Sequence, residues 1–81
     1  MSKSDKLLQR VRNSPKSVSF ADLDSLLIAY GFELRRSRGS HHIYSHTEYL
    51  ELRITVPFKR PHVGATYVKQ VLALIEQLEN G

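Results

Sequence analysis

The sequence predicts an α+β fold in which a three-stranded antiparallel sheet carries helices on one face, with an extra helix at the N-terminal end. Apolar residues recur at helical spacing in three segments, residues 6–12, 20–30 and 65–79. Apolar and polar residues alternate, as in half-buried strands, in three short runs, residues 32–36, 41–46 and 50–56. The connections between these runs are too short for parallel crossovers, so the strands should form a meander with one solvated face.

The composition indicates one small domain with a basic surface. A chain of 81 residues with 41% hydrophobic residues can build one core. The absence of cysteine excludes disulfides and thiolate zinc sites. The N-terminal residues are polar and no apolar run is long enough to cross a membrane, so we expect a cytoplasmic protein. The formal net charge of +4 favours a polyanionic or acidic partner.

Each helix has a recognisable boundary and an apolar face. Pro15 ends the first helix, and Ser19 or Phe20 begins the second, which Gly31 should end in a left-handed conformation. The expected apolar face of the first helix comprises Leu7, Leu8 and Val11. That of the second comprises Leu23, Leu26, Leu27 and Tyr30. The last helix should bury Tyr67, Val71, Leu74, Ile75 and Leu78.

Strict alternation assigns the strand residues to two faces. In the first strand Phe32, Leu34 and Arg36 should share one face, and Glu33 and Arg35 the other. In the second strand Tyr44 should face the helices together with His42 and His46. This leaves His41, Ile43 and Ser45 on the open face, beside Arg35 and Arg53. The reverse assignment stays open at this level, because the apolar Ile43 favours it. In the third strand the expected buried residues are Leu50, Leu52, Ile54 and Val56.

Residues 35–46 concentrate the groups that carry chemistry. This segment combines three arginines, a Gly-Ser pair and three of the four histidines. Fixed cations bind phosphate, and a neutral imidazole can take up a proton near physiological pH. The segment is therefore a candidate site for binding RNA and cutting it.

Three other interpretations of this segment remain open. A metal site is one, although His42 and His46 would be splayed apart on their strand and no acidic residue alternates with them. The histidines could instead be solvated strand residues in a module that only binds RNA. The arginines at 35, 36 and 38, taken alone, are typical of a solvated basic edge.

The run from Gly31 to Tyr44, Gly-Phe-Glu-Leu-Arg-Arg-Ser-Arg-Gly-Ser-His-His-Ile-Tyr, resembles the signature of the HicA (YcfA-like) family of toxins. These are toxin components of bacterial and archaeal toxin–antitoxin modules. The resemblance extends to the helix from Phe20, to Val56-Pro57 and to residues 67–72. It implies a fold similar to a double-stranded-RNA-binding domain, α-β-β-β-α, over residues 20–81, with a helix and linker at residues 1–19.

The resemblance also implies a function. Family members cleave mRNA without a metal ion or other cofactor, and their catalytic histidine follows Gly-Ser, which here is His41. A HicB-type antitoxin neutralises such toxins. We expect Gly39 to allow close approach of the phosphate and Ser40 to orient it. The expected backbone contacts of the RNA are Arg35, Arg38, Arg53 and Lys59.

Two questions stay open at this level. The acid that protonates the leaving group is unassigned, with His42 and His62 as candidates. A small RNA-binding module without hydrolysis is the alternative function, and a degenerate toxin that serves only as a protein-interaction domain is a third.

Overall fold

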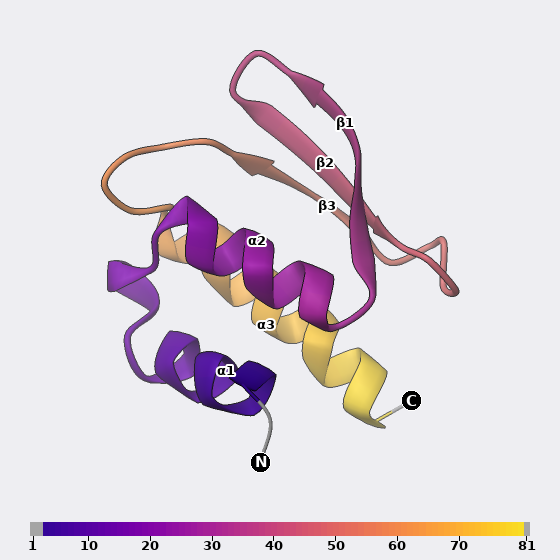
Figure 1. The fold of residues 1–81 in the computed structure, drawn as a ribbon, viewed down its shortest axis with the longest axis horizontal. Helices are drawn as coiled ribbons and strands as arrows, with labels where there is room; N and C mark the ends of the chain where they lie inside the picture. Colours follow the sequence, from indigo (N-terminus) through magenta and orange to yellow (C-terminus); the bar gives the residue numbers. More distant parts are fainter. Residues whose placement is uncertain (1–2, 81) are drawn as a thin grey trace.

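The computed structural model describes residues 3–80 and shows two layers, a sheet and a group of helices (Figure 1). The elements in chain order are α1 (Lys3–Asn13), a short 3₁₀ helix (Pro15–Ser17), α2 (Phe20–Ala29), β1 (Phe32–Arg38), β2 (His41–His46), β3 (Arg53–Pro57) and α3 (Ala65–Asn80). Within these residues the strands form an antiparallel sheet in the order β1-β2-β3. The predicted α+β meander with an added N-terminal helix is confirmed.

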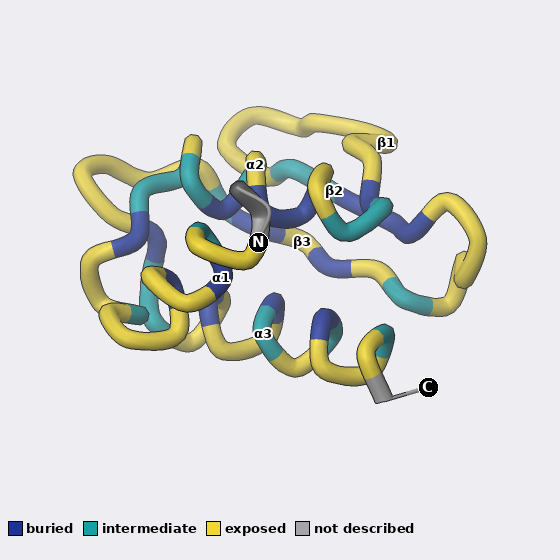
Figure 2. Tube along the Cα trace, turned by 60° about the horizontal axis from the view of Figure 1, so that its bottom comes forward, coloured by how far each residue is buried: buried dark blue, intermediate teal, exposed yellow. Residues whose placement is uncertain are grey.

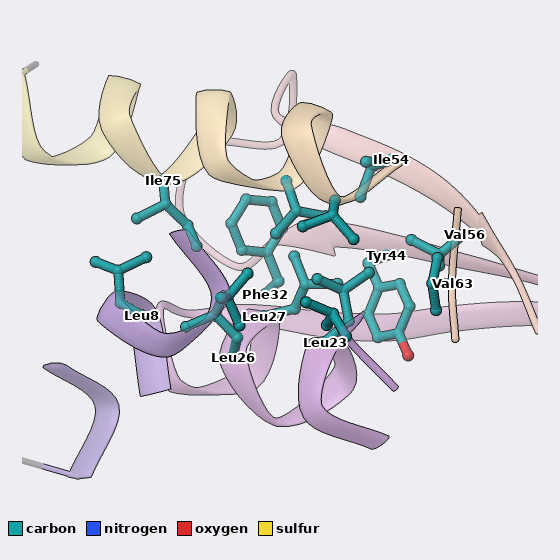
Figure 3. Packing of buried hydrophobic residues seen from close by; sticks show 14 residues of the cluster. Leu8, Leu23, Leu26, Leu27, Phe32, Tyr44, Ile54, Val56, Val63 and Ile75 are labelled. Carbon is teal, nitrogen blue, oxygen red and sulfur yellow. The ribbon is translucent and has the colours of Figure 1, made fainter. Parts of the chain in front are cut away.

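The hydrophobic core lies between the sheet and the helices (Figure 3). The sheet contributes Phe32, Tyr44, Ile54 and Val56, and the helices contribute Leu8, Val11, Leu23, Leu26, Leu27, Val68, Val71 and Ile75. Burial of one such side chain is worth roughly 1.5–3 kcal/mol. The core therefore fixes one face of the sheet against α2 and α3 and leaves the opposite face uncovered by helices (Figure 1).

Helix α2 has a serine N-cap at its start and a glycine with positive φ after its end. The Ser19 hydroxyl accepts a hydrogen bond from the backbone N–H of Asp22 at 3.1 Å, which caps the start of the helix. After the last turn Gly31 has φ +92°, as its predicted left-handed conformation requires. Gly31 also lies against His46, because a Cβ atom at this position would be 2.6 Å from His46 Nε2. The close approach allows the chain to turn directly from α2 into β1.

β1 does not alternate strictly, and the prediction for Arg36 is wrong. Leu34 is opposite Tyr44 and Arg36 is opposite Ile43, so one extra residue, Arg35, lies between these pairs as a β-bulge. Residues directly opposite each other share a face of the sheet. The bulge therefore moves Arg36 to the face of Ile43, away from the helices.

The turn between β2 and β3 differs from the prediction because a histidine side chain organises it. His46 Nδ1 accepts hydrogen bonds from the backbone N–H groups of Glu48 and Tyr49, at 3.0 and 3.2 Å. The chain then turns through Leu50, which is 62% exposed, and β3 begins only at Arg53. Leu50 was predicted to be a buried strand residue, and this is wrong.

The buried face of α3 is rotated from the prediction at its first turn. Val68 is fully buried, whereas Tyr67, which was predicted to be buried, is exposed. Further along, Val71 and Ile75 are buried as predicted. In residues 3–80 we find no helix whose length and apolar character would let it cross a membrane.

Candidate functional site

His41 is exposed at the first position of β2, directly after the turn of the β1–β2 hairpin. The turn consists of Gly39 and Ser40, and Gly39 has φ +56°, a conformation that glycine adopts without strain. Across the sheet His41 is opposite Arg38 on one side and Pro57 on the other. His41 therefore directly follows a tight turn and lies beside Arg38, on the face of the sheet opposite Tyr44.

The carbonyl oxygen of Ser40 connects this turn to the loop after β3. It accepts a hydrogen bond from the backbone N–H of Phe58 at 2.5 Å, and the Nδ1–H of His42 donates to it at 3.2 Å. Lys59 directly follows Phe58 in this loop. The predicted phosphate contacts Arg38, Ser40 and Lys59 are thus brought to one end of the sheet together with His41.

The remaining predicted contacts lie further along the same face. Arg53 is opposite Ser45, four residues from His41, which corresponds to a separation of about 13 Å along the strand. Arg35 lies at the same level, because its Nε donates to the Ser45 hydroxyl at 2.7 Å. Its Nη1 also forms a 2.8 Å ion pair with Glu33. Arg35 and Arg53 therefore belong to the open face but not to the immediate surroundings of His41.

Arg36 also lies on the open face, although the sequence pattern assigned it to the helix side. Its position opposite Ile43 places it between the Ser45 level and His41. Together the arginines at 35, 36, 38 and 53 form a basic stripe on the open face. In the burial-coloured view, β1 is exposed along most of its length (Figure 2). The bulge at Arg35 brings Arg36 into the basic stripe. The polar run of residues 35–38 gave no sign of this bulge.

The other histidines have different surroundings. The His42 ring lies on the helix side, 4.7 Å from the Phe20 ring, and so on the opposite face from His41. His46 is 7% exposed, and its Nε2–H donates to the Tyr30 carbonyl at 3.0 Å while Nδ1 accepts the two turn amides. His46 is a structural residue. His62 is exposed in the loop between β3 and α3.

The histidines do not come together as metal ligands. His42 packs against Phe20, and His46 packs against Phe32 at the other end of the strand, with ring centroids 5.1 Å apart. Within residues 3–80 no three histidine, aspartate or glutamate side chains are grouped closely enough to share a metal ion.

Tyr44 fixes β2 to α2 beneath the site. Its hydroxyl donates a 2.5 Å hydrogen bond to Asp24 Oδ1, and its ring is buried in the core (Figure 3). Burial, followed by the hydrogen bond to Asp24 and the negative charge of that carboxylate, raises the pKa of Tyr44 well above its ordinary value. Tyr44 is therefore a neutral donor at physiological pH and has a positioning role.

Comparison with known protein families gives a match over most of the chain. A family model described as the HicA toxin of bacterial toxin–antitoxin systems matches residues 20–79, from the first residue of α2 into the last turn of α3. Neither the curated proteins nor the solved structures gave a match. The family match covers the sheet, the hairpin turn with His41 and the loop with Lys59, and it leaves out α1. The chain belongs to the HicA toxin family of bacterial toxin–antitoxin systems.

Proposed function

We propose that this chain is a ribonuclease toxin that cleaves mRNA, with His41 as the proton-transferring residue. The observation that supports this best is the position of His41, an exposed imidazole directly after a Gly-Ser turn on the arginine-rich face of the sheet. Membership of the HicA toxin family supports the same activity. The substrate would be reached in the cytoplasm, where mRNA is translated.

The chemistry uses the nucleophile that RNA itself carries. His41 takes the proton of a ribose 2′-hydroxyl, and the 2′-oxygen attacks the adjacent phosphorus. The bond from phosphorus to the 5′-oxygen breaks, which leaves a 2′,3′-cyclic phosphate and, after protonation, a 5′-hydroxyl. His42 faces the other side of the sheet, so His62 in the Lys59 loop is the better candidate for the proton donor.

The cations divide between the reacting phosphate and its neighbours. Arg38 is opposite His41 in the sheet. Lys59 directly follows Phe58, whose backbone N–H bonds to the Ser40 carbonyl. Both cations are therefore placed to stabilise negative charge on the reacting phosphate. Gly39 leaves the backbone accessible, since a Cβ atom there would meet nothing within 4 Å. Arg36, Arg35 and Arg53 would bind phosphates further along the strand.

The test is cleavage of a single-stranded RNA by the purified chain in the presence of EDTA, with identification of the new ends. We expect cleavage with 2′,3′-cyclic phosphate and 5′-hydroxyl ends, and no cleavage of DNA of the same sequence, which lacks the nucleophile. Products with 3′-hydroxyl and 5′-phosphate ends, or complete inhibition by EDTA, would show that the mechanism is different.

We also propose that an acidic antitoxin of the HicB type covers the basic stripe and His41. Family membership implies an antitoxin, and the net charge of +4 favours an acidic surface on it. Mixing the chain with its HicB-type antitoxin should give a stable complex in which RNA is protected. A complex that cuts RNA as fast as the chain alone would contradict this masking.

A further inference from the structure

An apolar groove with a basic rim lies beside the hairpin turn, outside the sheet face that carries His41. The start of α2 lines it with Ser19, Phe20 and Ala21, and the loop after β3 lines it with residues 58–61. Its volume of about 370 Å³ falls within the range of roughly 300–1,000 Å³ typical of ligand sites.

Aromatic rings form the wall of this groove. The rings of Phe20 and Phe58 are 5.1 Å apart and inclined by 59°, and His42 packs behind Phe20 at 4.7 Å. Phe58 is nevertheless 39% exposed. The guanidinium of Arg60 lies over the Phe58 ring, 5.3 Å from its centroid. The groove therefore has a flat apolar surface with a cation lying over it.

The charges around the groove favour an anionic ligand. Lys59 and Arg60 line it, whereas the two carboxylates in the first turns of α2 already have partners. Asp22 forms a 2.8 Å ion pair with Arg10, and Asp24 accepts the hydrogen bond of Tyr44. A ligand that carries both an aromatic ring and a negative charge matches these surroundings.

The groove is next to the candidate catalytic residue in the chain. Pro57 is opposite His41 across the sheet, and Phe58 is the following residue. The backbone N–H of Phe58 bonds to the carbonyl of Ser40, the residue before His41. The Phe58 ring itself packs with Phe20 and lies near His42, on the helix side of the sheet. A strand of RNA whose phosphate is at His41 would therefore pass around the end of β2 to place a neighbouring base over Phe58.

We propose that this groove binds one nucleobase of single-stranded RNA, adjacent to the phosphate that is cut. The base stacks on Phe58 in place of Arg60, and the displaced Arg60 pairs with the RNA backbone together with Lys59. The exchange is favourable because stacking of a base on an aromatic ring is stronger than an exposed cation–π contact. This inference rests on the proposed ribonuclease function and adds that the substrate must be unpaired at this position.

The test measures RNA binding by the full chain carrying His41→Ala, so that the RNA stays intact. The probe is a short single-stranded RNA with 2-aminopurine, a fluorescent base that stacking quenches, at each position in turn. Phe58→Leu, which keeps apolar bulk against Phe20, should weaken binding about 5- to 100-fold and abolish quenching at one position. Phe58→Trp should retain both. Tyr49→Leu is the matched control, because that ring is 49% exposed beyond the other end of β2, and it should change neither.

The outcomes separate this inference from the proposed function. Affinity within twofold of the parent for Phe58→Leu would overturn the base-binding groove while leaving the ribonuclease assignment intact. Loss of antitoxin binding with unchanged RNA affinity would likewise overturn it, because the groove would then be a protein-docking site. If Phe58→Leu fails to fold, abasic substitutions in the RNA give the answer with the unaltered groove. A 5- to 100-fold loss at one abasic position supports the proposal, and no loss at any position overturns it.

Discussion

At the scale of single residues, the contact between Gly31 and His46 connects the helical layer to the sheet. Gly31 has φ +92°, and a Cβ atom there would approach His46 Nε2 to 2.6 Å. His46 cannot move away freely, since it bonds to the Tyr30 carbonyl and to two turn amides. Gly31→Ala should therefore lower the free energy of unfolding by at least about 1–3 kcal/mol, the usual cost of such backbone strain. Chemical denaturation measures this loss.

Gly39→Ala is the matched control for this prediction. Gly39 also has positive φ, +56°, but a Cβ atom there would meet nothing within 4 Å. Gly39→Ala should lower the free energy of unfolding by less than Gly31→Ala, because the new methyl group adds backbone strain but no steric clash. Equal losses for the two variants would mean that the approach to His46 contributes nothing.

Tyr44 gives the molecule a defined response to alkaline pH. Its pKa is raised in the folded chain above the ordinary value of 10.0, first by burial and then by Asp24. The folded state therefore holds the phenolic proton more tightly than the unfolded state does. The stabilisation is complete below about pH 10 and is lost as the pH rises above it.

Comparison with Tyr44→Phe isolates this effect. The variant loses a hydrogen bond to a carboxylate, which should cost about 1.5–3 kcal/mol at neutral pH. The difference in unfolding free energy between the parent and the variant should stay constant up to about pH 10 and shrink above it. A difference that is flat up to pH 11, or that grows, would contradict the assigned role.

At the scale of secondary-structure elements, α1 is part of the core although the family match begins after it. Leu8 and Val11 are buried with α2 and α3, and ion pairs join Arg10 to Asp22 and Arg12 to Glu79. Because exposed ion pairs contribute little, the packing should dominate. Leu8→Ala should cost about 2–5 kcal/mol of stability, and the exposed neighbour Gln9→Ala less than about 0.5 kcal/mol. Similar small losses for both would show that α1 is only loosely attached.

The bulge in β1 decides which arginines lie on the open face of the sheet, where we propose that RNA binds. If about three phosphates are neutralised, RNA affinity should fall with salt at a slope near −2 on logarithmic axes. Arg36→Ala should reduce that slope by about 0.7, the contribution of one phosphate on a single strand. Arg35→Ala should reduce it less, because Glu33 already offsets its charge. Filter binding at several salt concentrations measures both variants, and an Arg36→Ala slope equal to the parent's would contradict the register argument.

The sequence predicts elements well where one face is clearly apolar, as in α2 with Leu23, Leu26 and Leu27. It fails where side-chain contacts override a local pattern. Arg36 was assigned to the wrong face, because every residue from 35 to 38 is polar and a bulge leaves no mark in such a run. Leu50 extends an apolar alternation, yet the His46 ring holds the turn that exposes it. The candidate histidine could be proposed from the sequence because the Gly-Ser pair that precedes it is a local feature. The Phe20–Phe58 groove could not, because its two rings come from residues 38 positions apart in the chain.

At the scale of the whole molecule, the hydrophobic core and the candidate site lie on opposite faces of the sheet. Helices α2 and α3 bury one face and leave the opposite face uncovered by helices (Figure 1). That open face carries the basic stripe and His41. The hairpin turn and the loop after β3 meet at one end of this sheet through the Ser40–Phe58 hydrogen bond. The proposed binding and cleavage of RNA would therefore depend on surface residues, and their replacement should leave the core unchanged.

The most direct test of this account is single-turnover cleavage of RNA by His41→Ala, with His42→Ala as the matched control on the opposite face. Loss of the proton-transferring group should slow cleavage about 10²- to 10⁴-fold, or roughly 3–5 kcal/mol in the barrier. Thermal unfolding and RNA affinity should stay close to those of the parent, because His41 is exposed and the arginines are the proposed phosphate contacts. His42→Ala should cleave faster than His41→Ala. Cleavage by His41→Ala at the rate of the parent would contradict the central claim, and the chain would then be an RNA-binding module without this catalytic residue.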